Sequence, residues 1–210
     1  STMVDRITPA TTAADLEDFA TISGSFDPAL VIHEPFRQWV IEDNFPQGRP
    51  GWHLAGVQMV ADVERHELMK LRCLNGTHSA LAYLGYLAGY ETISDVVADP
   101  AFTQLCERLW QDEILPTVPQ PEGEDLPAYC AALMSRYYNP AIQHRTWQIA
   151  MDGSQKLPQR ILGTLRDIVA AGRMPKGLCL VIAGWMRYVA GTNEAGQAID
   201  VRDPMADQLN

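Results

Sequence analysis

The sequence predicts a mostly α-helical fold, all-α or nearly so. Much of the chain falls into segments whose hydrophobic residues recur at helical spacing, separated by loops rich in proline and glycine. Strands do not alternate regularly with helices, and no internal repeat is present. Hydrophobic residues make up 47% of the 210 residues and charged residues 20%, as in folded proteins with one sizeable core or two small ones.

The first third of the chain predicts short elements. Thr12 followed by Asp15 resembles a capping box, which opens a helix. Pro35 suits the first position of another helix. The expected elements are, in order, a strand followed by a turn (4–9), a short helix (12–19), a helix (35–43), a loop (44–51), and a short strand or the entry of a buried helix (57–63).

The remaining two thirds predict a set of helices. The first is long and interrupted near Asn75-Gly76, because glycine is unfavourable inside a helix. Three prolines between 116 and 124 predict a loop. The expected helices cover residues 64–89, 100–114, 127–138, 141–151, 159–171 and 177–191, followed by a polar, turn-rich stretch from 192 to 210.

Composition excludes several classes of function. The formal charge is −10, with 26 acidic and 16 basic residues, which argues against a nucleic-acid binder. A few cations in a cleft would still allow a small anionic substrate. The most apolar run, Leu178 to Met186, is about half the roughly 20 residues of a membrane-spanning helix. No signal peptide is visible, so we expect a cytoplasmic protein without a membrane partner.

Cysteine spacing gives no sign of a metal site. The four cysteines lie far apart, without the C-x₂-C spacing of zinc or redox motifs. We therefore expect no metal, and buried reduced thiols. The chain also lacks G-x-G-x-x-G and G-x-x-x-x-G-K-[ST], so no residue can be named as a cofactor ligand from sequence.

The most reactive-looking segment runs from His66 to His78. On one continuous helix at about 100° per residue, Glu67, Lys70, Asn75 and His78 share roughly a 140° arc. A lysine whose pKa is lowered by burial can act as a base for a hydroxyl proton. Asn and His donors would stabilise the developing alkoxide. The pattern therefore fits interconversion of an alcohol and a carbonyl.

A structural interpretation of the same residues stays open. Glu67 and Lys70 at i,i+3 are typical of a solvated ion pair, and Asn75-Gly76 is typical of a helix end. Gly76 costs a helix interior about 1 kcal/mol relative to Ala, which a close approach of a ligand or a backbone would explain.

Several phrases together resemble one family. They are Met3-Val4-Asp5-Arg6-Ile7-Thr8-Pro9, Glu34-Pro35-Phe36 with Trp39-Val40-Ile41-Glu42-Asp43, Gly48-Arg49-Pro50, Lys70-Leu71-Arg72 with Leu74-Asn75-Gly76 and His78, Asn139-Pro140, and Asp152-Gly153-Ser154. In this order they resemble the C-terminal part of the mannitol dehydrogenase family, the polyol-specific long-chain dehydrogenases. The resemblance covers nearly the whole chain.

The resemblance implies roles for individual residues. Lys70 matches the general base, Asn75 and His78 the pair that holds the substrate oxygen, and Glu67 a residue of proton exchange with solvent. Asp5 matches an aspartate near the reaction centre, and Lys156 a basic residue that contacts the distal substrate. The family uses NAD(P) without a metal; we expect NAD, although NADP stays open.

The resemblance also implies a fold. We expect a multi-helical domain similar to the C-terminal domain of 6-phosphogluconate dehydrogenase, with residues 1–10 ending an interdomain segment and 11–210 forming the helical domain. The Rossmann half is expected to be absent from this chain and to act as its partner within the same gene product. The fragment alone is then expected to be inactive.

A local departure points to the substrate. His144-Arg145-Thr146-Trp147 is similar to the hexuronate reductases, which interconvert fructuronate and mannonate, whereas mannitol-type members carry an arginine where Gln148 stands. The planar fork of Arg145 suits a substrate carboxylate, with His144 and Lys156 as further candidate contacts. Alternatively, Arg145 pairs with a surface acid and His144 is structural.

The expected function is therefore NAD-dependent interconversion of a keto sugar acid and its alcohol, the fructuronate/mannonate pair. Mannitol 2-dehydrogenase or tagaturonate reductase activity is the nearest alternative. A helical binding module without catalysis is the alternative from another class.

Overall fold

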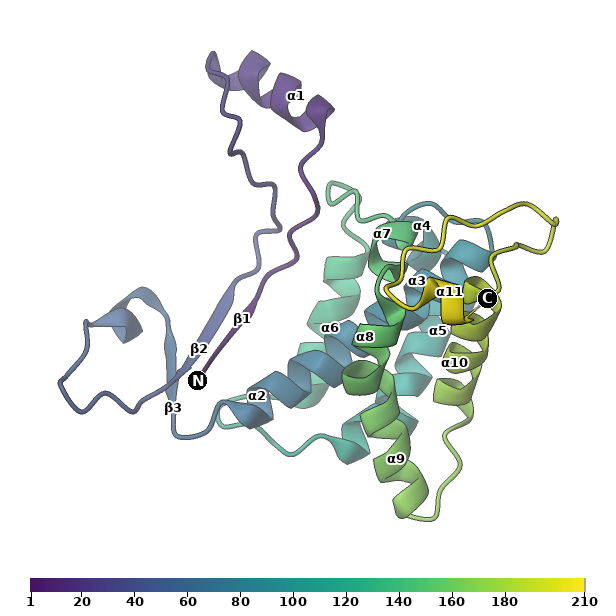
Figure 1. Cartoon of the computed structure of the whole chain (residues 1–210). Helices are drawn as coiled ribbons and strands as arrows, with labels where there is room; N and C mark the ends of the chain where they lie inside the picture. Colours follow the sequence, from purple (N-terminus) through teal and green to yellow (C-terminus); the bar gives the residue numbers. More distant parts are fainter. Residues whose placement is uncertain (210) are drawn as a thin grey trace. The chain divides into compact units, whose positions relative to one another are not determined.

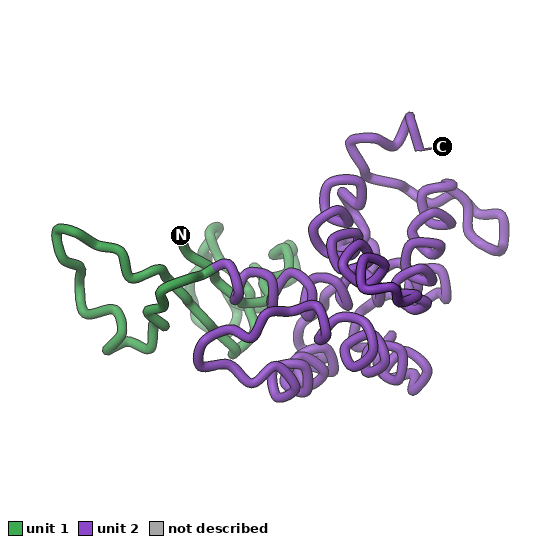
Figure 2. Tube along the Cα trace, turned by 90° about the horizontal axis from the view of Figure 1, so that it is seen from below, with its two compact units in different colours: residues 1–63 green, residues 64–210 purple. Residues whose placement is uncertain are grey.

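A computed structural model describes residues 1–209 of the chain. It consists of two compact units, residues 1–63 and residues 64 onward (Figure 2). The sequence placed the start of the helical domain at residue 11, whereas the structure draws the boundary between Val63 and Glu64. Within the described residues, no helix is long and apolar enough to span a membrane.

The first unit contains a three-stranded sheet in the order β1-β2-β3 (Figure 1). Strand β1 (Thr2–Asp5) pairs antiparallel with β2 (Gln38–Glu42), which pairs parallel with β3 (Gln58–Val60). One face of this sheet buries a small cluster of Met3, Val40, Val60 and Val63. The strand expected within residues 57–63 is thereby confirmed as β3.

Between β1 and β2 lies helix α1 (Ala13–Ser23), and a 3-10 turn (Trp52–Ala55) precedes β3. The side chain of Thr12 accepts a hydrogen bond from the Asp15 N–H, and the Asp15 carboxylate accepts one from the Thr12 N–H. The expected capping box is therefore confirmed. The helix extends beyond Phe19 and ends at Gly24, whose φ of 72° terminates it.

The helix expected from Pro35 to Asp43 is wrong. This stretch forms β2, in which Val40 is fully buried against Met3. Trp39, Val40 and Ile41 are aromatic or β-branched residues that favour strands, and Val40 and Ile41 pair with both β1 and β3. The tertiary pairing overrides the local signal from Pro35.

The second unit is helical and holds the main core of the protein. Tyr83, Leu133, Ile161 and Leu178 are among its fully buried side chains. Its helices are α2 (Glu64–Met69), α3 (Thr77–Leu87), α4 (Ile93–Ala98), α5 (Pro100–Arg108), α6 (Leu126–Tyr137), α7 (Thr146–Ala150), α8 (Gly153–Leu157), α9 (Gly163–Ala170), α10 (Lys176–Val189) and α11 (Ala206–Leu209). Helix α3 packs against α7 and α10.

Three segments of this unit are π-helical, with hydrogen bonds from residue i to i+5. They are Lys70–Gly76, Leu109–Ile114 and Pro158–Leu162, and a 3-10 turn (Leu115–Thr117) follows the second. Each π-helix continues directly from an α-helix. The stretches expected as helices over 64–89, 100–114 and 159–171 are therefore helical, but each contains both an α-helical and a π-helical segment.

The helix expected from Ala141 to Met151 is only partly right. Helix α7 covers Thr146–Ala150. The turn before it is held by Asn139, which accepts hydrogen bonds from the N–H groups of Ala141 and Ile142, and Arg145 forms an isolated β-bridge with Thr92. The N–H of Thr146 donates to the carbonyl of Glu91 at 2.9 Å, so the helix begins at Thr146 and not earlier. Helices α4 and α8 were not expected from the sequence.

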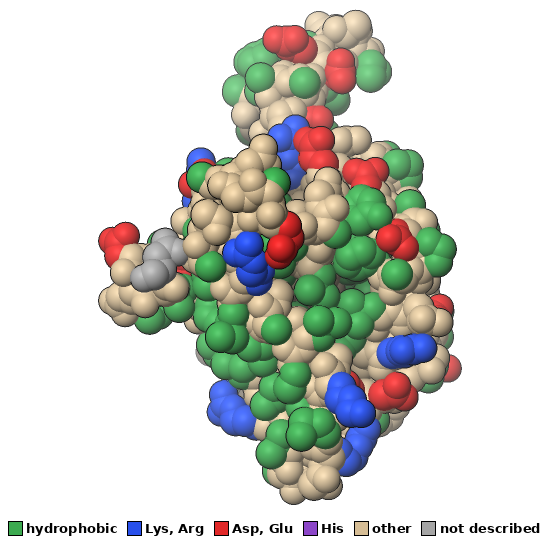
Figure 3. Space-filling view, turned by 90° about the vertical axis from the view of Figure 1, so that its right-hand side faces the viewer, with side chains coloured by type: hydrophobic (Ala, Val, Ile, Leu, Met, Phe, Trp, Pro, Cys, Tyr) green, Lys and Arg blue, Asp and Glu red, His purple; other side chains and the backbone are tan. Residues whose placement is uncertain are grey.

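Exposed apolar side chains gather on one face of the molecule, as Figure 3 shows. In the helical unit, the exposed large apolar residues include Val169, Met174, Leu180 and Met186. Leu180 also borders a surface hollow of about 410 Å³ that is lined by Leu84, Phe102 and Leu105.

Candidate active site

The candidate site is built on the π-helix that begins at Lys70. In a straight α-helix, Lys70 and Asn75 would lie about 140° apart around the axis, at about 100° per residue. A π-helix has more than four residues per turn and bonds residue i to i+5, so residues five apart come to nearly the same face. Both side chains are half-buried. The π-helix therefore groups Lys70 and Asn75 better than the regular helix expected from sequence.

Side-chain donors satisfy the backbone carbonyls that this widened turn leaves available. The indole Nε1 of Trp110 and the hydroxyl of Thr77 donate to the Cys73 carbonyl at 2.9 and 2.6 Å. The hydroxyl of Tyr137 donates to the Leu74 carbonyl at 2.9 Å. Buried carbonyls without partners would be costly, so these donors stabilise the π-helix.

Gly76 allows a second backbone to approach this π-helix. A Cβ atom at position 76 would lie 2.9 Å from the carbonyl oxygen of Arg160. The two π-helices, Lys70–Gly76 and Pro158–Leu162, pack against each other at this point. The close backbone approach that the sequence suggested for Gly76 is thus present.

His78 follows on α3 and is 6% exposed. Its ring stacks on Tyr137 at 5.3 Å between ring centroids and meets the ring of His144 edge-on at 4.6 Å. Burial, and then the charges of His144, Arg160, Arg136 and Lys156, lower the pKa of His78 well below its usual value. The imidazole is therefore neutral at pH 7. Its Nε2 has no hydrogen-bond partner within residues 1–209.

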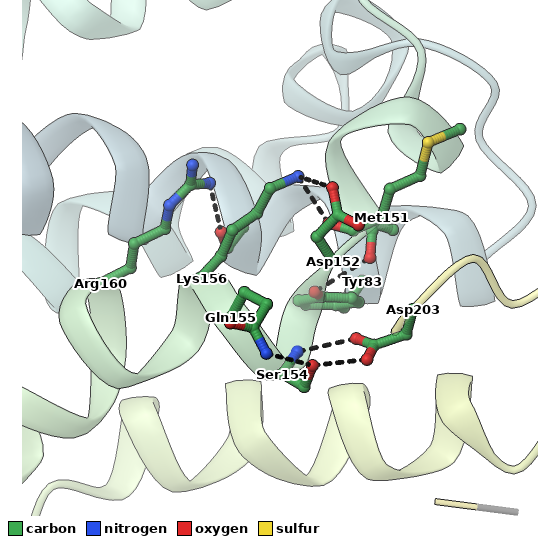
Figure 4. A network of polar contacts seen from close by, with 10 residues as sticks. Tyr83, Met151, Asp152, Ser154, Gln155, Lys156, Arg160 and Asp203 are labelled. Carbon is green, nitrogen blue, oxygen red and sulfur yellow. Dashed lines mark hydrogen bonds and ion pairs between the residues drawn. The ribbon is translucent and has the colours of Figure 1, made fainter. Parts of the chain in front are cut away.

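Lys156 and Arg160 lie one turn apart on α8 and the following π-helix, and their side chains extend to the same side (Figure 4). The Lys156 ammonium donates to the carbonyl of Met151 at 2.6 Å and lies 3.6 Å from the Asp152 carboxylate. Burial and the charge of Arg160 lower the pKa of Lys156. Arg160 donates from Nη1 to the hydroxyl of Ser79, the neighbour of His78.

The turn before α8 is conformationally unusual. Asp152 is the one non-glycine residue with a positive φ, 57°, among residues 1–209. A Cβ atom on Gly153 would lie 2.5 Å from both the Trp185 Nε1 and the Tyr83 hydroxyl. Such strain persists only where the surrounding structure holds it, and it concentrates at functional sites.

The other expected site residues are more dispersed. Glu67 is exposed on α2, one turn before Lys70. Asp5 lies in the first unit, in β1, with 1% of its surface exposed. His144 is half-buried against His78, and burial followed by the charge of Lys156 lowers its pKa to about 4.

Arg145 does not join this group. Its side chain is 55% exposed and forms an ion pair with Glu91 at 3.8 Å. It borders a surface hollow of about 410 Å³ lined by Tyr86, Tyr90 and Trp147. Arg145 thus has an acidic partner at the surface, as the alternative interpretation expects, and a contact with a substrate carboxylate stays a prediction.

Two residues near His78 were not singled out from the sequence, Arg160 and Tyr137. The signal for Arg160 was present as a second basic residue at i+4 from Lys156, on the same helical face. Tyr137 offered no signal, because its contact with His78 joins segments about 60 residues apart. No group of three or more metal-ligating side chains occurs in the described part of the chain.

Two family models match the chain. The mannitol dehydrogenase C-terminal domain matches residues 62–210, and the mannitol dehydrogenase Rossmann domain matches residues 1–54. The expectation that the Rossmann half is absent is therefore wrong: residues 1–54, which lie in the first unit, match this domain. That part lacks a glycine-rich fingerprint, which is why the sequence pattern did not reveal it.

Similar proteins agree with these matches. The chain is 56% identical to D-mannonate oxidoreductase of Escherichia coli (strain K12) over 97% of its length, and 42% identical to mannitol 2-dehydrogenase of Phaeosphaeria nodorum over its full length. The structure superposes on a ternary complex of Pseudomonas fluorescens mannitol 2-dehydrogenase with NAD and D-mannitol, with a TM-score of 0.90 and 36% identity over 99% of this chain. The chain spans 42%, 37% and 42% of these three proteins, respectively.

Proposed function

Because the chain belongs to the mannitol dehydrogenase family, we propose that it forms the substrate-binding and catalytic part of an NAD-dependent secondary-alcohol dehydrogenase. The observation that carries this proposal is the placement of Lys70 and Asn75 on one π-helix, directly followed by a buried, neutral His78. The remainder of a complete nucleotide-binding domain is the proposed partner within the same polypeptide.

Each of the three residues has a distinct task in this proposal. Lys70 removes the hydroxyl proton of the substrate during oxidation and returns it during reduction. Asn75 donates a hydrogen bond to the same oxygen as negative charge develops on it. His78, being neutral, donates from one ring nitrogen to that oxygen without competing with Lys70 for the proton.

NAD, when bound, supplies the acceptor or donor of the hydride. Lys70, Asn75 and His78 fit this chemistry, because none of them is redox-active and each acts on the proton or the oxygen. In this proposal Glu67, which is exposed one turn before Lys70, exchanges that proton with solvent. Asp5 remains a candidate near the reaction centre through the family resemblance alone.

A sugar acid is the proposed substrate, as the fructuronate/mannonate pair. Two observations support it: 56% identity to a D-mannonate oxidoreductase, and three cations that act on His78 in a chain of net charge −10. Arg136, Lys156 and Arg160 together favour an anionic ligand. His144, in edge-on contact with His78, is a candidate contact beside them.

An uncharged polyol is the second candidate. It is supported by the structural similarity to a mannitol 2-dehydrogenase in complex with D-mannitol and by several mannitol dehydrogenases among the relatives. The tagaturonate/altronate pair also carries a carboxylate, which could pair with the same three cations.

The test is NADH oxidation by a polypeptide that carries this chain with a complete nucleotide-binding domain. Fructuronate and fructose are supplied in parallel, to wild type, Lys70→Ala and the control Lys176→Ala, which changes an exposed lysine on α10. We expect a faster rate with fructuronate, a loss of at least about 100-fold in Lys70→Ala, and no change in the control. Preference for fructose supports the polyol, and no rate with either substrate from folded protein supports a non-catalytic module.

A further inference from the structure

Arg160 is a partly buried cation without an anionic partner. Within residues 1–209, its one hydrogen bond runs from Nη1 to the Ser79 hydroxyl at 3.2 Å, and no carboxylate lies within ion-pair distance. Arg72, which is also buried, pairs with Asp167 at 2.6 Å. Burial lowers the pKa of Arg160, as expected for a charge that loses hydration without gaining a counter-ion.

A second cation adds to the unpaired positive charge around Arg160. Lys156 lies one turn away on the same side (Figure 4). Both cations lower the pKa of His78. The Asp152 carboxylate is nearer to Lys156 and leaves Arg160 unpaired. Like charges brought together in a partly buried place cost free energy, unless an anion binds there.

The position of Arg160 is fixed from both ends. Its backbone carbonyl lies against Gly76, at the end of the π-helix that carries Lys70 and Asn75. Its Nη1 is held by Ser79, next to His78. Within residues 1–209, Nε and Nη2 make no hydrogen bond. These two donors form the edge of a guanidinium that matches the two oxygens of a carboxylate.

We propose that Arg160 binds the carboxylate of a sugar-acid substrate through its Nε–Nη2 edge and thereby selects acids over polyols. The inference rests on the proposed function, and names the residue that carries its specificity. It differs from the sequence-based hypothesis, in which the exposed and already paired Arg145 holds the carboxylate.

The experiment uses the same full-length dehydrogenase, with Arg160→Met, Arg160→Lys and Arg145→Met. Arg166→Met is the control, because Arg166 is exposed on α9. KM and kcat are measured for fructuronate, fructose and NADH, and thermal melting checks that each variant is folded. Lysine keeps the charge but not the fork, so Arg160→Lys also serves if the methionine variant does not fold.

We expect Arg160→Met to raise the KM for fructuronate about 10- to 100-fold, the range of a lost charge-assisted hydrogen bond. The KM for fructose and NADH should change less than about threefold, with Arg160→Lys intermediate and Arg166→Met like wild type. An effect confined to Arg145→Met, an equal loss with fructuronate and fructose, or a raised KM for NADH alone would each overturn the inference. A wild type inactive with both sugars, by contrast, overturns the proposed function itself.

Discussion

The carboxylate of Asp203 binds both polar groups of Ser154 at the start of α8. One oxygen accepts the Ser154 N–H at 2.7 Å, and the other accepts the Ser154 hydroxyl (Figure 4). Burial alone would raise the pKa of Asp203, but hydrogen bonds from Ser154 and Met205 and the charge of Lys156 lower it. The C-terminal segment therefore holds, through an ionised side chain, the helix that carries Lys156.

Residues 200–203 of this C-terminal segment make further contacts with the helical unit. The N–H of Asp152 donates to the Arg202 carbonyl at 2.9 Å, and the Arg202 guanidinium lies 4.4 Å from the centre of the Trp147 ring. The indole of Trp147 donates to the carbonyl of Asp200. Residues 200–203 are thus joined to α7, to the strained turn at Asp152 and to α8.

We expect Asp203→Ala to reduce stability by about 1–2 kcal/mol, because three hydrogen bonds to a charged group, from the N–H and hydroxyl of Ser154 and the N–H of Met205, are lost at a half-buried position. The KM for the sugar substrate should rise about 3- to 10-fold, with a smaller change in kcat, since Lys156 loses the support of its helix. Urea denaturation and steady-state kinetics measure both effects. Asp200→Ala removes an exposed carboxylate that pairs with Arg202, and should change neither quantity appreciably.

Gly76→Ala tests the packing of the two π-helices. The added methyl group would lie 2.9 Å from a backbone oxygen, so one backbone must shift. We expect a loss of about 1–3 kcal/mol in the free energy of unfolding, together with a lower kcat because Lys70 and Asn75 lie on the displaced segment.

Gly163→Ala is the matched control. There the added Cβ would meet its nearest neighbours at 3.7 and 3.8 Å, which is ordinary contact, and alanine favours a helix. This variant should be neutral or more stable by up to about 1 kcal/mol, as measured in the same denaturation experiment. Equal destabilisation of both variants would mean that general helix perturbation, not contact with Arg160, explains the result.

The sequence predicted much of the helical unit because long amphipathic segments fold according to their own pattern. The capping box at Thr12 and the loops rich in proline are likewise local signals. The strand β2 was missed because its pairing with β1 and β3 is decided by distant segments. The π-helix at Lys70 was missed because its stabilising donors, Trp110 and Tyr137, come from other helices.

The residues of the candidate site also fall into those that local sequence reveals and those that only the tertiary structure reveals. Lys70, Asn75 and His78 share one short stretch of chain, so their grouping is visible in the spacing. Arg160 becomes notable only when its lack of a carboxylate partner is known, which is a property of the folded surroundings. Arg145 stood in a suggestive phrase, but its exposure and its pairing with Glu91 depend on tertiary structure.

Tyr137→Phe removes the donor to the Leu74 carbonyl while keeping the ring that stacks on His78. A buried carbonyl then loses a partner, and we expect a cost of about 1–2 kcal/mol in stability. The kcat should fall more than the KM rises, because the altered π-helix displaces Lys70 and Asn75.

Tyr138→Phe provides the comparison one residue later. Tyr138 is 45% exposed, and within residues 1–209 its hydroxyl bonds only to Thr103. Its stability should change by less than about 0.5 kcal/mol. A similar loss of stability in both tyrosine variants would contradict a specific role of Tyr137 at the π-helix.

His144 should make the protein less stable in mild acid. Its pKa is lowered to about 4 in the folded state, from a usual value of 6.5, by burial and by the charge of Lys156. The unfolded state therefore binds a proton first as the pH falls. The contribution of His144 to the free energy of unfolding is therefore fully present above pH 6.5. It decreases by up to about 3 kcal/mol as the pH falls from 6.5 towards 4.

Denaturation by urea at intervals between pH 8 and pH 4.5 measures this decrease. His144→Gln should flatten the profile between pH 6.5 and 4.5, leaving the part that the buried His78 contributes with the same sign. Gln143→Ala, which changes an exposed, non-titrating neighbour of His144, should leave the profile as in wild type. An unaltered profile in His144→Gln would show that His144 accepts its proton as readily in the folded state as in the unfolded chain.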